Sequence, residues 1–357
     1  MPHERRANTT TMADPSRRPT LEDVAREAGV SRALVSIVIR GAPGSSEQTR
    51  ARVLAVAERL GYRPDTRARL LARTSARLLG VTYQVGALHH ADLLGPIYEA
   101  AEKTGYELIL SGRTRAHDER KALHTLLGYR CDAILLLGAA LPEADLARVA
   151  AILPIVLVGR RMVRHIDVVD VIRTDERAGM AFAVDHLAGL GHQRIAHIDG
   201  GAGEIAADRR RGYRWAMAAA GLRSEALIVA GGDTGEDGLR AATTLLASQP
   251  RPTAVVCFND ECAWGVLRGL AMAGLAAPDD ISVVGYDGSP LARLAPRELT
   301  TVHQDVESLA RLSVERAVAR LGGAAWTEDA VVRPLALVTG ETTAPAVDFV
   351  TRRSSYS

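Results

Sequence analysis

Short apolar runs that alternate with amphipathic stretches occupy most of the chain after residue 77. Such alternation is typical of parallel β-sheets covered by helices on both faces, because each apolar run supplies a strand that is buried on two sides. Eight runs over this length indicate two sheets, so the sequence predicts an α/β body of two lobes. Ligands of such sheets bind beyond the carboxyl ends of the strands. The predicted strands are Leu78–Tyr83, Glu107–Leu110, Ala133–Leu137, Ile155–Val158, Arg194–Ile198, Leu227–Val229, Ala254–Phe258 and Ile281–Tyr286.

The chain of 357 residues is longer than a single hydrophobic core usually organises, so two or three folding units are expected. No apolar run approaches the roughly 20 residues that cross a bilayer, and the start of the chain lacks the apolar centre of a secretion signal. These absences predict a cytoplasmic protein with no membrane partner. Cys131, Cys257 and Cys262 form no CxxC pair, and we expect them to be reduced thiols in the core rather than metal ligands.

The net charge of +2 is divided unevenly along the chain. Residues up to Arg77 include 15 Arg, no Lys and 8 acidic residues, a net charge of +7, whereas the remainder holds 29 basic and 34 acidic residues, a net charge of −5. A basic segment beside a mildly acidic one indicates a polyanionic partner, and nucleic acid is the usual one.

The basic segment contains a pattern of short helices. Thr20 begins a sequence similar to a capping box, which predicts a helix over Leu21–Ala28 that ends at Gly29. Ser31 can cap a second helix that runs to about Arg40. Two short helices joined by a turn that contains glycine form a helix-turn-helix, whose second helix fits the major groove of DNA.

A third helix, capped by Ser45 or Ser46 and ended by Gly61, would close a small core. The spacing alone is equally consistent with a plain three-helix bundle. The predicted core residues of the three helices are Leu21, Val24, Ala25, Ala28, Leu34, Val35, Val38, Val53, Val56, Ala57 and Leu60.

Polar residues follow three of the predicted strands of the body. Asn259 comes after one strand, Asp287 ends another, and Asp208-Arg-Arg-Arg-Gly-Tyr213 opens the helix after a third. Each of these residues also has a purely structural interpretation, because Asn and Asp cap helices and Arg commonly faces solvent.

The N-terminal sequence closely resembles the DNA-binding head of the LacI/GalR family of regulators. The similarity is carried by TLEDVAREAGVSRALVS at residues 20–36 and SSEQTRARVLAVAERLGYRP at residues 45–64. Phrases of the body, including ILPIVLVGRR, HLAGLGHQRIAHI, PTAVVCFNDECAWGVLRGL and ISVVGYDGSPLARL, resemble the effector domain of the same family, so the resemblance extends from Thr20 to about Thr343. It implies a helix-turn-helix head and a two-lobed body like that of periplasmic binding proteins.

The resemblance implies a set of residues that contact operator DNA, in the recognition helix and in a hinge helix within residues 64–76. An alternative is that the latter segment is a basic linker. Two residues depart from the family. Ile37 stands where a polar or basic residue is common, and Arg40 stands where Asn is common. They predict an operator that differs from the standard one. The predicted DNA-binding residues are Thr20, Ser31, Arg32, Ala33, Ser36, Ile37, Arg40, Ala68 and Leu71.

The resemblance also implies an effector site between the lobes. Arg209, Asn259 and Asp287 are the candidates in the second lobe, and a planar Arg with Asn and Asp suits a sugar or another polyol. In the first lobe the family often has Asn-Pro and aromatic residues where this chain has His89 and Asp92, which either line the cleft or lie on the surface. In addition, Gly159 stands where Asp is frequent in the family.

The predicted domain boundaries follow from these assignments. They comprise a disordered tail (1–19), a helix-turn-helix domain (20–63), the hinge helix and linker (64–76), an effector-binding and dimerisation domain (77–344) and a C-terminal tail (345–357). The first lobe is assigned about residues 77–160 and 291–321, and the second about residues 161–290 and 322–344, so the chain is expected to cross between the lobes three times.

The sequence therefore predicts a homodimeric repressor that binds double-stranded operator DNA under the control of a carbohydrate effector, with no catalytic residue, metal or cofactor. An activator or a regulator that needs a corepressor is an alternative within the same fold. A different class is an NAD(P)-binding oxidoreductase, because Gly201-Ala-Gly-Glu-Ile-Ala206 follows a strand and precedes a helix. No acidic residue ends an adjacent strand about 20 positions later, which weighs against it. A transport-type sugar-binding protein would have no use for the head.

Overall fold

The computed structural model describes residues 19–63, 76–162, 169–294, 297–325 and 330–346, and the chain divides into two compact units, 1–75 and 76–357. The predicted tails, apart from their innermost residues, and the predicted hinge helix with Ala68 and Leu71 lie outside the described residues. We call the first unit the head and the second the body.

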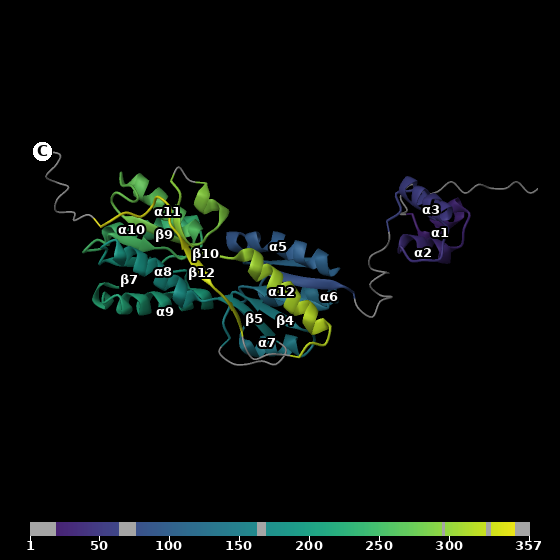
Figure 1. The fold of residues 1–357 in the computed structure, drawn as a ribbon, viewed down its shortest axis with the longest axis horizontal. Coiled ribbons are helices and arrows are strands. Elements are labelled where there is room, and N and C mark those ends of the chain that lie inside the picture. Colours follow the sequence, from purple (N-terminus) through teal and green to yellow (C-terminus); the bar gives the residue numbers. More distant parts are fainter. Residues whose placement is uncertain (1–18, 64–75, 163–168, 295–296, 326–329, 347–357) are drawn as a thin grey trace, which may run out of the picture. The chain divides into compact units, whose positions relative to one another are not determined.

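The head contains three short helices, α1 (Leu21–Ala28), α2 (Arg32–Ile39) and α3 (Glu47–Arg59) (Figure 1). The predicted N-terminal caps are confirmed, because the hydroxyl groups of Thr20, Ser31 and Ser46 each accept a hydrogen bond from a backbone N–H three residues later. Thr20 also forms a full capping box with Asp23, whose carboxylate accepts the Thr20 N–H at 2.8 Å. Gly29 ends α1 with a φ of 64°, a conformation that favours glycine.

A small apolar core joins the three helices of the head. Leu34 is an exception to the predicted core, since it is only half-buried and does not pack against the cluster. Ile39, one helical turn and one residue later, packs there instead. The buried residues are Val24, Ala25, Ala28, Val35, Val38, Val53, Val56 and Ala57.

The first lobe of the body is a six-stranded parallel sheet with the strand order β11-β5-β4-β3-β1-β2. Four helices flank it. The strands are β1 (Leu78–Gln84), β2 (Glu107–Arg113), β3 (Ala133–Leu137), β4 (Ile155–Val158), β5 (Val169–Thr174) and β11 (Val331–Arg333), and the helices are α5 (Leu88–Thr104), α6 (Glu119–Gly128), α7 (Glu143–Ala150) and α12 (Val306–Leu321).

The second lobe is a six-stranded sheet with the order β12-β10-β9-β8-β6-β7, in which β12 alone runs antiparallel to its neighbour. Its strands are β6 (Ile195–Ile198), β7 (Leu227–Val229), β8 (Ala254–Val256), β9 (Ser282–Asp287), β10 (Thr300–Gln304) and β12 (Leu335–Val338). Its helices are α8 (Glu176–Gly189), α9 (Glu204–Ala219), α10 (Gly235–Ala247) and α11 (Asp260–Met272), with 3₁₀ turns η1 (Arg223–Glu225) and η2 (Pro290–Arg293).

Both sheets are buried on two faces, which explains the continuous apolar runs in the sequence. In the second lobe, Val255 and Val283 pack with α10 and α11, whereas Ala254, Val256 and Val284 point the other way and pack with α8 and α9. The predicted α/β body of two sheets is therefore confirmed.

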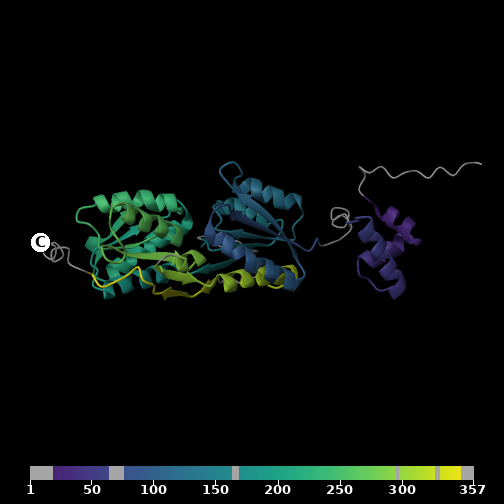
Figure 2. The same ribbon diagram turned by 90° about the horizontal axis from the view of Figure 1, so that it is seen from above.

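The chain passes between the two sheets three times in the body. It crosses from β5 to α8 at Thr174, from β10 to α12 at Gln304, and from β11 to β12 through the single residue Pro334. In Figure 2 this last segment follows the lower edge of the body from one lobe to the other.

These crossings differ from the predicted lobe boundaries. Strand β5 lies in the first sheet although residues 161–290 were expected in the second lobe, and β10 lies in the second sheet although residues 291–321 were expected in the first. Residues 322–344 were also expected in the second lobe, but Val331–Val338 contains two strands, β11 in the first sheet and β12 in the second. Polar residues interrupt β5 and β10, so neither forms the apolar run that identifies a buried strand in sequence.

The three cysteines are buried and free, as predicted, and burial raises the pKa of the Cys131 thiol to about 12. None of the helices in the described part of the chain is long and apolar enough to cross a membrane.

Candidate functional site

A cavity of about 290 Å³ lies between the two lobes, and we call it the cleft. Residues at the carboxyl ends of strands from both sheets line it. Gln84 and Arg113 end β1 and β2 in the first lobe, while Asn259 follows β8 and Asp287 ends β9 in the second. The cleft thus lies where ligands of parallel sheets bind, beyond the carboxyl ends of the strands.

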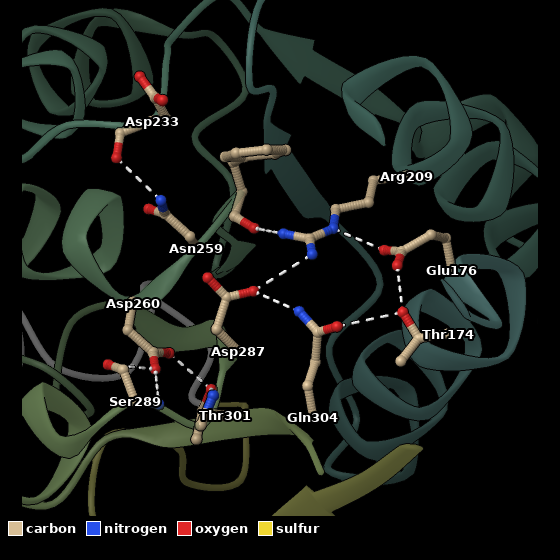
Figure 3. Close-up of polar contacts among 12 residues, drawn as sticks. Thr174, Glu176, Arg209, Asp233, Asn259, Asp260, Asp287, Ser289, Thr301 and Gln304 are labelled. Carbon is tan, nitrogen blue, oxygen red and sulfur yellow. Dashed lines mark hydrogen bonds and ion pairs between the residues drawn. The ribbon is translucent and has the colours of Figure 1, made fainter. Parts of the chain in front are cut away.

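Arg209 of α9 is the centre of a buried polar network on the second-lobe side of the cleft (Figure 3). Its Nε donates to Glu176 Oε2 at 2.7 Å, its Nη2 donates to Asp287 Oδ1 at 3.2 Å, and its Nη1 donates to the carbonyl of Phe258. The guanidinium also lies over the ring of Tyr286, 3.6 Å from the ring centroid. Each nitrogen of the guanidinium therefore donates a hydrogen bond within the protein.

The same network includes the two crossings that follow β5 and β10. Gln304 donates from Nε2 to Asp287 Oδ1 at 2.8 Å, and its Oε1 lies 3.1 Å from the hydroxyl of Thr174. That hydroxyl donates to Glu176 Oε1 at 2.6 Å. Thr174 and Gln304, at two of the passages between the lobes, are thus hydrogen-bonded to each other (Figure 3). Thr174 is also bonded to Glu176, and Gln304 is bonded to Asp287, which lines the cleft.

The charges of this network stabilise one another. Burial alone would raise the pKa of the Glu176 carboxyl, but the adjacent Arg209 outweighs it and lowers that pKa. Burial likewise opposes the charge of Arg209, yet Glu176 and Asp287 raise its pKa above the ordinary value. Both shifts favour the charged forms of Glu176 and Arg209 in the folded protein.

Asn259 has a structural role in addition to its place in the cleft. Its Oδ1 accepts the Cys262 N–H at 2.7 Å and caps α11, while its Nδ2 donates to the Asp233 carbonyl at 2.8 Å. The predicted helix cap is therefore confirmed, and the same residue lines the cleft.

Asp260 lies behind the cleft and fixes the loop after β9. Its carboxylate accepts hydrogen bonds from the Ser289 N–H at 2.7 Å, the Ser289 hydroxyl at 2.9 Å and the Thr301 hydroxyl at 2.6 Å. Burial and the nearby Asp287 raise the pKa of Asp260 to about 7, although these hydrogen bonds oppose the shift. Asp287 itself has a φ of 100°, so its side chain depends on this loop for its position.

His90 lines the first-lobe side of the cleft and was not predicted from the sequence. Its Nδ1 accepts the Gln84 N–H at 3.0 Å, which leaves the ring proton on Nε2. Burial, together with His89 and Arg113, lowers the pKa of His90 to about 3. The ring is therefore a neutral hydrogen-bond donor next to Gly138, which also lines the cleft.

The two effector-binding residues predicted in the first lobe differ in their position relative to the cleft. His89 lines it, whereas Asp92 is not among the lining residues and is half-buried on α5. Burial raises the pKa of Asp92, with His89 opposing and Asp287 adding to the shift. Of the two predicted first-lobe residues, only His89 lines the cleft.

Arg113 is a second cleft residue that the sequence analysis missed. It is buried, donates from Nη1 and Nη2 to the carbonyls of Gly138 and Leu137 at 3.0 and 2.7 Å, and lies 3.3 Å from Glu119. It lies three residues beyond the predicted end of β2, because the strand runs through Gly112 to Arg113.

The glycine-containing segment that suggested a dinucleotide site also borders the cleft. Gly203 is the N-cap residue of α9, without a side-chain cap, and Glu204, Ile205 and Ala206 follow it along the cleft wall. The carboxylate of Glu204 at this helix start would repel a pyrophosphate.

The head presents the outer side of α2 to solvent. Arg32, Ala33 and Arg40 are exposed and Ser36 and Ile37 are half-buried, while Val35 and Val38 of the same helix face the core. Arg32 forms an exposed ion pair with Glu22 at 3.1 Å, and Arg40 donates from Nε to the carbonyl of Ser36 at 3.0 Å. Exposed ion pairs contribute little free energy, so Arg32 can exchange Glu22 for another anion.

Comparisons with known proteins match two regions of the chain. Residues 20–65 match the family model of bacterial regulatory proteins of the lacI family, and residues 184–343 match that of a periplasmic binding protein-like domain. The transcriptional regulator GalR of Salmonella typhimurium strain SL1344 is 33% identical over 310 residues, which cover 85% of this chain and 90% of the relative.

Solved structures are similar over most of the chain. The lac repressor dimer bound to operator and the anti-inducer ONPF has a TM-score of 0.77 and 29% identity, covering 92% of this chain and 100% of that one. The complex of the transcriptional regulator CelR with cellobiose has a TM-score of 0.66 and 29% identity, covering 91% and 100%.

Proposed function

Since the chain belongs to the lacI family of bacterial regulatory proteins, we propose that it is a transcriptional repressor whose affinity for operator DNA changes when a small molecule binds in the cleft. The observation that carries this proposal is the network of Arg209, Asp287, Gln304 and Thr174. It connects the wall of the cleft with two of the passages between the lobes. A ligand that contacts Asp287 therefore acts on the groups that hold the lobes together.

The proposed ligand is an uncharged polyol, most simply a sugar. Neither buried arginine of the cleft is left without a carboxylate partner, since Arg209 is paired with Glu176 and Asp287, and Arg113 lies beside Glu119. An anionic ligand would therefore add negative charge to a buried site whose two arginines are already paired. Hydroxyl groups can instead accept from His90 Nε2 and donate to the free oxygen of Asp287. The cellobiose complex of the CelR relative is consistent with this class of ligand.

The proposed DNA-binding surface is the outer side of α2, placed in the major groove. Two heads of a homodimer would bind successive major grooves, with the segment that contains Ala68 and Leu71 at the minor groove between them. Arg32 is the candidate for a contact with guanine, while Ile37 offers only apolar contact, such as to a thymine methyl group. Thr20 and Ser31 lie at the starts of α1 and α2, where free backbone N–H groups suit phosphate oxygens.

Ligand binding can alter DNA affinity only if the ligand binds the two lobe arrangements unequally. Contacts from both lobes line the cleft, so a bound sugar would stabilise one arrangement. A ligand that relieves repression would stabilise the arrangement with low affinity for the operator. A ligand that repression needs would stabilise the arrangement with high affinity. The sign of the change in affinity distinguishes them.

The test begins with selection of genomic DNA fragments by the full chain, followed by affinity measurements on the selected operator. We expect at least one neutral mono- or disaccharide of a panel to change operator affinity about tenfold or more, within the range of ordinary allosteric coupling. In the Asp287→Asn variant this response should disappear while operator affinity stays within about twofold.

Failure to select any specific fragment would reject DNA recognition. A response to sugar that persists unchanged in Asp287→Asn would reject the cleft as its site. The matched control is Asp208→Asn, which removes a carboxylate from the same lobe outside the cleft.

A further inference from the structure

A second cavity lies at the junction of the two lobes and is separate from the cleft. It has a volume of about 340 Å³, within the range of small-molecule sites. Gly159 and Arg173 line it from the first lobe, and the start of α8 together with Arg211 and Trp215 of α9 line it from the second. We call it the junction cavity.

The junction cavity carries an excess of positive charge. Four arginines line it, and of these only Arg211 has a carboxylate partner, Asp208, among the described residues. The three others are Arg161, Arg173 and Arg177.

The remaining acids of the junction cavity are engaged elsewhere. Asp175 caps α8 by accepting the N–H groups of Arg177 and Ala178 at 3.2 Å each. Glu176 is committed to Arg209, which lines the cleft. By formal charge, four arginines face three acids in the cavity, and the pairing of Glu176 with Arg209 leaves two of the arginines without a lining carboxylate to offset them.

Two of these arginines are held in place for a ligand. Arg177 lies over the ring of Trp215, with its guanidinium carbon 3.7 Å from the ring centroid, which fixes its direction. Arg173 donates from Nη1 to the carbonyl of Thr174 at 2.9 Å, while its Nε is buried and has no hydrogen-bond partner within the described part of the chain. A buried donor without a partner is costly, and an oxyanion in the cavity would satisfy it.

Gly159 adds to the excess of positive charge in the junction cavity. It lines the junction cavity with a φ of 82° and contributes no side chain, at a position where the sequence resemblance leads one to expect Asp. A carboxylate there would offset part of the arginine charge. Its absence leaves both the space and the charge available.

We propose that the junction cavity is a second ligand site, which binds a small molecule that carries a phosphate group. Guanidinium groups match phosphate oxygens in geometry and bind them with charge-assisted hydrogen bonds. The cavity is larger than an inorganic phosphate needs, so the ligand is an organic phosphate whose remainder lies toward Trp215. This site does not rest on the proposed function of the cleft, because none of the arginines Arg161, Arg173 and Arg177 lines the cleft.

The test uses the full chain and inorganic phosphate as the probe, titrated by calorimetry at constant ionic strength maintained with chloride. We expect saturable binding of one phosphate per chain, accompanied by a change in Trp215 fluorescence that is absent in Trp215→Phe. The variant Arg161→Gln/Arg177→Gln should weaken phosphate binding about tenfold or more. Both side chains are exposed, so the variant should fold normally.

The matched control is Arg214→Gln/Arg223→Gln, which removes the same charge from exposed positions outside the cavity. It should bind phosphate within about twofold of the unmodified chain. Absence of saturable phosphate binding by the unmodified chain would overturn the proposal. Equal weakening in both double variants would also overturn it, since it would show a general charge effect.

Discussion

The guanidinium of Arg209 and the carboxylate of Asp287 form a buried ion pair at 3.2 Å between residues that are 78 positions apart in the sequence. The pair joins α9 to the end of β9 at the wall of the cleft. Because Glu176 holds the opposite edge of the guanidinium, the position of Asp287 depends on α8 as well.

Replacement of Arg209 by Met should destabilise the body strongly. Glu176 would then be a buried carboxylate without its partner, and removal of one member of such a pair costs about 3–5 kcal/mol. Chemical denaturation of the full chain, followed by circular dichroism, measures this change. Arg214→Gln should shift the free energy of unfolding by less than about 0.5 kcal/mol. If Arg209→Met/Glu176→Met is no more stable than Arg209→Met alone, the isolated charge of Glu176 is not the cause.

His90 should remain neutral throughout the range in which histidine ordinarily titrates. Its pKa is lowered to about 3, and its Nδ1 accepts the Gln84 N–H, so the Nε2-protonated tautomer should persist down to pH 5. Nitrogen-15 NMR of the imidazole ring reports both the charge and the tautomer. A titration midpoint near the ordinary histidine value of 6.5 would contradict the described environment.

His197 should make the body less stable in acid. Burial lowers its folded-state pKa to about 4, below the ordinary value of 6.5, so the unfolded chain binds a proton that the folded chain does not. The free energy of unfolding should therefore fall as the pH falls from 6.5 toward 4, by up to about 1.4 kcal/mol per pH unit from this residue.

Replacement of His197 by Gln, which retains a donor for the Val256 carbonyl, should reduce that slope even if it lowers overall stability. His124→Gln should leave the slope unchanged. Identical slopes in the three proteins between pH 6.5 and pH 4.5 would show that His197 is already protonated or exposed.

The two adjacent serines before α3 should differ in their effect on the head. Ser46 accepts the Thr49 N–H at 3.2 Å, so Ser46→Ala should cost the head about 1 kcal/mol. The hydroxyl of Ser45 is buried without a hydrogen-bond partner within the described residues, and Ser45→Ala should be neutral or slightly stabilising. Hydrogen exchange of α3 amides in the full chain measures the difference. Equal effects of the two substitutions would reject the cap assignment.

A fragment that begins at Ala76 should lose specific DNA binding and keep its small-molecule site. The body is a compact unit with its own cores, and none of its cleft residues comes from the head. Binding of a selected operator and of the responsive sugar should be compared in the fragment and the full chain. Operator affinity that survives in the fragment would contradict the assignment of DNA binding to α2.

Features with a local signal could be predicted from the sequence. Thr20 and Ser31 cap their helices through contacts three residues away, so short-range chemistry identified them. Arg209 and Asp287 follow strands with apolar cores, and their positions in one cleft follow from the behaviour of parallel sheets.

The partners of these residues could not be predicted in the same way. Thr174 and Gln304 meet across 130 positions of sequence, and they end β5 and β10, whose polar residues conceal the strands. His90 was overlooked beside His89 because only the strand geometry shows that its Nδ1 accepts the Gln84 N–H. Non-local pairing, unlike a helix cap, leaves no periodic trace in the sequence.

The hydrogen-bonded side chains of Thr174 and Gln304 lie where two of the three connections leave one lobe for the other. A turn of one lobe about these connections displaces each atom in proportion to its distance from them. A shift of a fraction of an ångström at Asp287, close to the pivot, would therefore become a much longer arc at the far end of the first lobe. Selection for a new ligand can accordingly alter the cleft by small substitutions, provided that it leaves these two side chains unchanged.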